Sequence, residues 1–95
     1  MATPAATSAE WFGAHGYAVL GTEGLLPRGE AIQSVPYFHS VERKPDEDWD
    51  SFVARASAET IDHIRAFEQR FAEEGDVYVN LTWVSEAEFQ ILRQS

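Results

Sequence analysis

Three aspartates alternate along the chain at Asp46, Asp48 and Asp50, a spacing that opens many calcium-binding loops. In such a loop the sixth residue is a glycine and the twelfth is a glutamate that binds the cation with both oxygens. Here the sixth residue is Ser51 and the twelfth is Ser57, so those features are missing. The triplet instead suits the start of a helix, because carboxylates are favoured beside the positive end of the helix dipole.

Glu59 and His63 are four residues apart, a spacing that places both side chains on one helical face, where they could grip a single metal ion. No second histidine lies at a matching distance, and His15 and His39 are isolated in the sequence. The chain contains no cysteine, which excludes zinc ribbons, iron–sulfur clusters and a thiol nucleophile. We therefore expect no metal centre and no cofactor, and we expect His63 to pack against the apolar side of its helix.

Acidic residues dominate the charge. The chain has 16 Asp and Glu against 7 Lys and Arg, a net charge of −9, and residues 42–76 hold most of the acids. Such a charge repels nucleic acid and anionic membranes, so we expect direct binding to neither. Serine nucleophile elbows, phosphate-binding glycine loops and dinucleotide motifs are also absent.

The leading hypothesis is a non-catalytic, acidic protein-binding module. It would regulate or inhibit a partner by covering a basic surface, such as one that normally holds nucleic acid. The residues assigned to the partner-binding surface are Asp46, Glu47, Asp48, Asp50, Glu59, Asp62, Glu73 and Glu74, with Ile61, Phe38 and Leu25 or Leu26 as exposed apolar anchors. The commoner explanation for such a charge run is a solvated helix face.

The alternative hypothesis is a small ligand-binding or enzymatic domain whose pocket is completed in a homodimer. Tyr37, His39, Asn80 and Trp83 fall on two predicted strands and would line a shallow aromatic pocket with polar tips. Aromatic residues on strands are more often part of a core.

The first half of the chain predicts a short helix and two strands. Residues 1–7 are expected as a mobile tail, and Ser8 can cap a helix over residues 9–14 that ends at Gly16. A strand over 17–20 is followed by a stretch rich in glycine, residues 21–30, which predicts an exposed loop. Residues 31–41 predict a second strand, and Pro36 predicts that this strand is at a sheet edge or broken, because proline cannot donate a ladder hydrogen bond.

The second half has the clearest periodicity. Apolar residues recur at helical spacing from residue 46 to residue 74, which predicts one long amphipathic helix ended by Gly75, or two helices if Ser57 starts a second. Residues 76–84 alternate as a strand, with Val77, Val79, Leu81 and Trp83 on its apolar side. Ser85 and Glu88 form a capping-box pattern before a last helix over 86–93.

These elements predict an α+β fold, with a sheet of three or four strands, one long amphipathic helix packed on a face and short terminal helices. The length of 95 residues suits one domain, over residues 8–95. The apolar stripe of the long helix, including Trp49, Phe52 and Phe67, should bury the apolar side of the last strand. Without a signal sequence or a long apolar segment, we expect a cytoplasmic protein.

Overall fold

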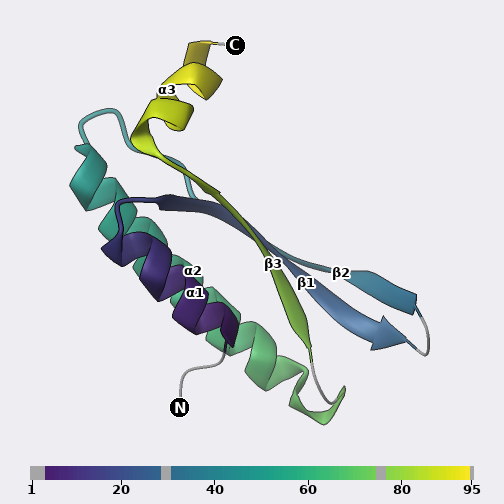
Figure 1. Ribbon diagram of the computed structural model, residues 1–95. Coiled ribbons are helices and arrows are strands. Elements are labelled where there is room, and N and C mark those ends of the chain that lie inside the picture. Colours follow the sequence, from purple (N-terminus) through teal and green to yellow (C-terminus); the bar gives the residue numbers. More distant parts are fainter. Residues whose placement is uncertain (1–3, 29–30, 75–76, 95) are drawn as a thin grey trace.

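The computed structural model describes residues 4–28, 31–74 and 77–94 and has an α+β fold, as predicted (Figure 1). The order of elements is α1 (Pro4–Ala14), β1 (Ala18–Arg28), β2 (Ala31–Ser40), α2 (Trp49–Arg70), a 3-10 turn (Ala72–Glu74), β3 (Tyr78–Val84) and α3 (Glu86–Gln94). No helix within the described ranges has the length and apolar character needed to cross a bilayer.

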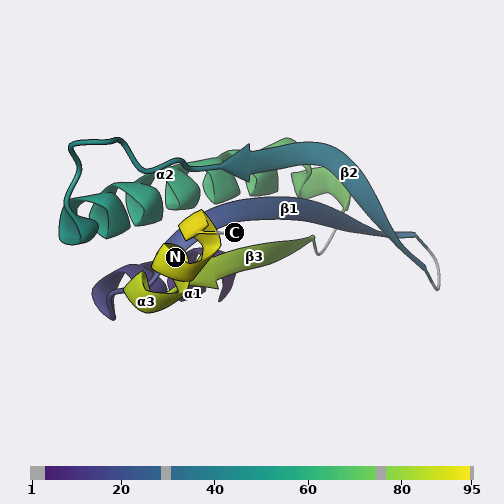
Figure 2. The same cartoon turned by 90° about the horizontal axis from the view of Figure 1, so that it is seen from above.

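The sheet has three antiparallel strands in the order β2-β1-β3, so β1 is central and the other two are edges. Helices α1 and α2 lie side by side against one face of the sheet (Figures 1 and 2). None of the described helices lies across the centre of the opposite face, and α3 projects from the end of β3 (Figure 2). The result is a two-layer fold in which one broad sheet face is left uncovered.

Helix α2 forms as one continuous element and passes through Ser57 without a break. Asp48 is its N-cap, and the Asp48 side chain accepts a hydrogen bond from the Ser51 amide at 2.7 Å. The helix ends at Arg70 with Phe71 as C-cap, earlier than the predicted end near Gly75. The buried residues of α2 are Trp49, Phe52, Val53, Ala56, Ser57, Thr60, Ile64 and Phe67. All of them except Ser57 belong to the predicted apolar stripe, whose last member, Phe71, is half-buried at the C-cap.

Small residues bring α1 against α2. Ala6 and Ala9 are buried against Ile64, and the Ser57 hydroxyl donates a hydrogen bond to the Ala9 carbonyl at 3.0 Å. Residues 4–7, which the sequence assigned to a tail, lie in α1, so the helix begins before the predicted Ser8 cap. Proline is favoured in the first turn of a helix, because its missing amide hydrogen has no intrahelical acceptor there.

The predicted loop over residues 21–30 is wrong for residues 21–28, because β1 continues through Gly21 and Gly24 to Arg28, whereas residues 29–30 lie outside the described part of the structure. Gly24 lies directly beneath the Phe67 ring, where an added Cβ would come within 2.6 Å of the ring carbons Cε1 and Cζ. Glycine is therefore needed for a close contact between strand and helix. The same residue removes the alternating pattern by which a strand is recognised in the sequence.

Strand β2 confirms the expectation for an edge strand that is interrupted at Pro36. Glu23 of β1 pairs with Phe38, but Leu25, two residues on, pairs with Ser34, so β2 has two more residues than β1 between these pairs. The unpaired stretch, residues 35–37, contains the proline. The irregularity thus falls where an amide donor is missing.

The last helix begins with the predicted capping box. The Ser85 amide donates to Glu88 Oε1 at 2.9 Å, and the Glu88 amide donates to Ser85 Oγ at 3.2 Å. At the same end of β3, the Trp83 side chain is 47% exposed rather than buried by α2 as predicted. Phe12 of α1 stacks on its indole at 4.4 Å between ring centroids, so helix α1 is its neighbour at this end of the strand.

Candidate binding site

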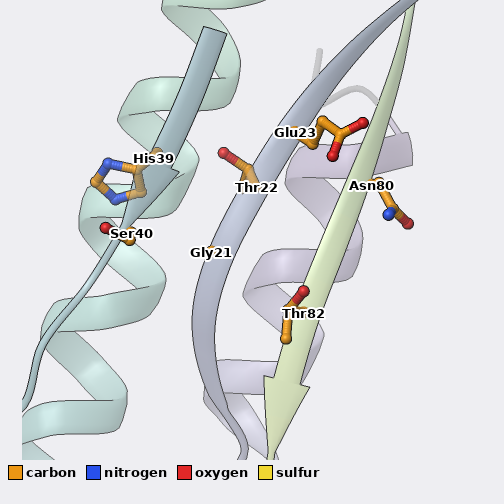
Figure 3. Close-up of a pocket in the computed structure, with 7 residues that line it drawn as sticks. All are labelled: Gly21, Thr22, Glu23, His39, Ser40, Asn80 and Thr82. Atoms are coloured by element: carbon orange, nitrogen blue, oxygen red, sulfur yellow. The ribbon is translucent and has the colours of Figure 1, made fainter. Parts of the chain in front are cut away.

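A depression of about 330 Å³ lies on the uncovered face of the sheet and crosses all three strands (Figure 3). The residues that line it are Gly21, Thr22, Glu23, His39, Ser40, Asn80 and Thr82. Six of these seven residues carry polar side chains, and none is lysine or arginine. The depression therefore presents hydrogen-bonding groups and one carboxylate at the surface.

Strand register explains the depression. Gly21 pairs with Ser40 on one side and with Thr82 on the other, so the middle of this cross-strand row has no side chain. In the next row on this face, Glu23 is paired with Asn80. Gly21 is also needed for close strand packing, because a Cβ there would lie 3.0 Å from the His39 carbonyl oxygen.

The four residues of the predicted aromatic pocket do not line one common pocket in the described structure. His39 and Asn80 border the depression, but the His39 ring is turned away from Asn80 toward α2 (Figure 3). Trp83 contacts α1 instead. The side chain of Tyr37 lies outside the described part of the structure.

His39 stacks on His63 of α2, with 4.7 Å between the ring centroids and an angle of 22° between their planes. Burial lowers the pKa of His63, and the neighbouring His39 lowers it further. The neutral form of the His63 imidazole is favoured here, because its charged form would be poorly solvated. Within the described residues, no group of three or more His, Asp or Glu side chains is arranged to hold a metal ion.

Three of the acidic residues assigned to the partner surface have structural roles. Arg55 binds Glu47 at 2.7 Å and Glu59 at 2.6 Å, and its third contact is the Glu42 carbonyl. The hydrogen bonds from Arg55 are the main cause that lowers the pKa of Glu47 to about 2. Asp48 caps α2, and the hydrogen bonds from Ser51 lower its pKa.

The remaining acidic residues of that set are spread along α2 and its entry segment. Asp46, Asp50, Asp62 and Glu73 are exposed, whereas the side chain of Glu74 lies outside the described residues. Among the predicted apolar anchors, Ile61 is half-buried beside α1 and Phe38 also has its side chain outside the described part. Leu25 is half-buried and Leu26 is buried against Phe67, so Leu26 is not an exposed anchor.

An aromatic patch on the outside of α1 is the feature that sequence reasoning missed. It consists of Trp11, Phe12, His15, Tyr17 and Trp83. Trp11 stacks on His15 at 4.0 Å, and Phe12 links this pair to Trp83. The indoles of Trp11 and Trp83 are each about half exposed, at 51% and 47%. Trp11 lies in the predicted helix and His15 directly follows it, and their spacing of four residues was the one local signal of this contact.

This chain matches no family model, no curated protein and no solved structure.

Proposed function

We propose that this protein is a non-catalytic binding module that attaches to a basic surface of a partner protein and regulates or inhibits the partner by covering that surface. The observation that carries the proposal is the aromatic patch, in which two half-exposed tryptophans stand on a domain with a net charge of −9. Exposed aromatic clusters are characteristic of protein interfaces, where tryptophan and tyrosine supply a large share of the affinity.

Charge and aromatic area have separate parts in this proposal. An acidic domain attracts a basic surface over several ångströms, which raises the association rate and disfavours acidic competitors. Tight binding also requires apolar side chains that leave water, and Trp11 and Trp83 are suited to this because part of each ring is already held by its neighbours. The carboxylates best placed to attract the partner are the exposed Asp46, Asp50 and Asp62.

The first test uses the partner recovered by affinity capture from the native cells and measures its affinity for purified variants. Trp11→Ala and Trp83→Ala are each expected to weaken binding by roughly 30-fold, the effect of losing about 2 kcal/mol at an interface hot spot. Ile91→Ala is the control, because Ile91 is also an exposed apolar residue, at 68%, but lies on α3, outside the patch.

The second test concerns charge. The double variant Asp46→Asn, Asp50→Asn is expected to slow association and to flatten its dependence on salt, with a smaller effect on dissociation. Glu47 and Asp48 are left unchanged, because neutralising them would break the Arg55 contact and the cap of α2. If both tryptophan variants bind like the Ile91 variant and the salt dependence is unchanged, the proposed function is wrong.

A further inference from the structure

We infer that the outer edge of β3 binds an extended segment of the partner protein, which pairs with it antiparallel and adds a strand to the sheet. This inference rests on the proposed function, since it names the place and the form in which the partner binds. Among the described strands, β3 pairs only with β1 and is therefore an edge. Figure 3 shows β3, which carries Asn80 and Thr82, at the border of the sheet with α1 behind it.

The two edges of the sheet differ in how they are protected. Strand β2 contains Pro36 within the unpaired residues 35–37, and both features hinder pairing with a further strand. Strand β3 has no proline and no charged side chain, and its residues pair with β1 in unbroken order from Tyr78 to Val84. Natural proteins usually protect exposed edge strands, so an edge without these features indicates that β3 is paired when the protein acts.

The backbone of β3 determines the form of the ligand. In an antiparallel pair, every second residue of a strand directs its N–H and C=O groups away from the neighbouring strand. Within the described residues, no backbone hydrogen bond joins the outer side of β3 to another element. Four residues of β3 are exposed, namely Tyr78, Asn80, Thr82 and Trp83. An extended polypeptide supplies a matching row of donors and acceptors, whereas a helix satisfies its own backbone groups.

This edge is continuous with the aromatic patch, because Trp83 belongs to both. Phe12 of α1 stacks on the Trp83 indole, and Leu81 also packs on the side of β3 that faces α1. Asn80 and Thr82 lie on the uncovered face instead. Side chains alternate between the two faces of a strand, so every second side chain of an added strand would lie beside Leu81 and Trp83. We therefore expect apolar residues at these positions of the segment and polar residues between them.

Charge favours a segment with basic ends over a second copy of this chain. Helix α1 and β3 together contain a single charged residue, Glu10, so the contact itself can be apolar. The exposed Glu86 follows the end of β3 by two residues, where it can attract a lysine or arginine that flanks the segment. Pairing with a second copy would instead bring together two domains that each carry a net charge of −9.

The experiment titrates the isotope-labelled protein with a short peptide in which valine and threonine alternate between terminal lysines. Amide shifts measured by NMR are expected to concentrate in residues 78–84, and every second amide there should exchange more slowly with solvent. Two further peptides carry N-methyl groups on one or the other set of alternate amides. The set that faces β3 should weaken binding at least about tenfold, and the other set should have little effect. Glutamate ends should also weaken binding.

Two matched variants then locate the edge that is used. Thr82 and Ser40 are both exposed and both pair with Gly21, so they lie in one cross-strand row at opposite edges. Thr82→Lys places a like charge beside the basic segment and should weaken peptide binding about tenfold. Ser40→Lys makes the same change of charge at the β2 edge and should have at most about a twofold effect. Unchanged amide spectra elsewhere would verify that each variant is folded.

Several results would overturn the inference. One is that the β3 amides stay unchanged with the peptide at millimolar concentration, and another is that both N-methylated peptides bind equally well. If the protein alone protects these amides more strongly as its own concentration rises, the occupant is a second copy. If partner binding depends on Trp11 and Trp83 but Thr82→Lys behaves like Ser40→Lys, the inference fails while the proposed function stands.

Discussion

Replacing Gly24 by alanine tests the most unexpected part of the fold, the extension of β1 through a stretch rich in glycine. The new Cβ would lie 2.6 Å from two carbons of the Phe67 ring, which is 2% exposed and packed among Leu26 and Phe71. Crowding a close-packed core typically costs about 1–3 kcal/mol. The backbone itself would gain roughly 0.5–1 kcal/mol, because alanine is less flexible than glycine in the unfolded chain. The net expectation is a loss of stability of about 1–2 kcal/mol.

Urea unfolding followed by tryptophan fluorescence measures this loss, and a second substitution shows its cause. Phe67→Leu removes the ring carbons that Gly24→Ala would crowd, so in this background Gly24→Ala should be neutral or stabilising. The difference between the two backgrounds is the coupling free energy of the pair, expected at about 1–3 kcal/mol, the cost of crowding alone.

Two results would refute the reasoning. If residues 21–28 formed an exposed loop, Gly24→Ala would be neutral or would stabilise the protein in the wild-type background. If Gly24→Ala cost the same free energy with phenylalanine and with leucine at position 67, the two residues would not be in contact.

Three further predictions concern individual contacts. Because the pKa of His63 is lowered in the folded state, the unfolded chain binds a proton at His63 more readily than the folded protein does. The free energy of unfolding should therefore fall as the pH drops below the ordinary value of 6.5. His63→Phe should reduce this decline in urea unfolding curves measured between about pH 7.5 and about pH 5.5. Arg55→Gln should raise the pKa of Glu47 from about 2 toward 4.5, which an NMR titration of the side-chain carboxyl would measure, and an unchanged value would show that Arg55 is not the cause. Ser85→Ala removes one half of the capping box and should cost about 0.5–2 kcal/mol in thermal or urea unfolding, whereas Ser8→Ala, inside α1, should cost less.

Much of the fold was predictable because its signals are local. The stripe from Trp49 to Phe67 repeats at helical spacing, and a helix of this length has room for several repeats. Gly16 adopts a left-handed conformation, with φ of 82°, where the sequence predicted a helix end. The capping box at Ser85 was also correct, since both of its hydrogen bonds join residues three apart.

The sequence predicted the first residues of the central strand, 18–20, but its continuation to Arg28 was not predictable from its own residues. A strand shows itself through alternating apolar side chains, and glycine at positions 21 and 24 interrupts that alternation. The reason for each glycine lies elsewhere in the chain, in the Phe67 ring and in the backbone of β2. A glycine that is required by a close contact with a residue far away in the sequence produces no recognisable pattern among its own neighbours.

The candidate sites likewise combine features that the sequence predicts with features that depend on tertiary contacts. From the sequence alone, composition determined the acidic character of the protein, and periodicity determined its long helix and its last strand. Only the tertiary structure decided which acidic residues have structural roles, because Arg55 binds Glu47 and Glu59 and the start of α2 is capped by Asp48. The depression depends on the register of three strands, and the aromatic patch depends on the approach of β3 to α1. Both are made by contacts between residues far apart in the chain, which local spacing does not encode.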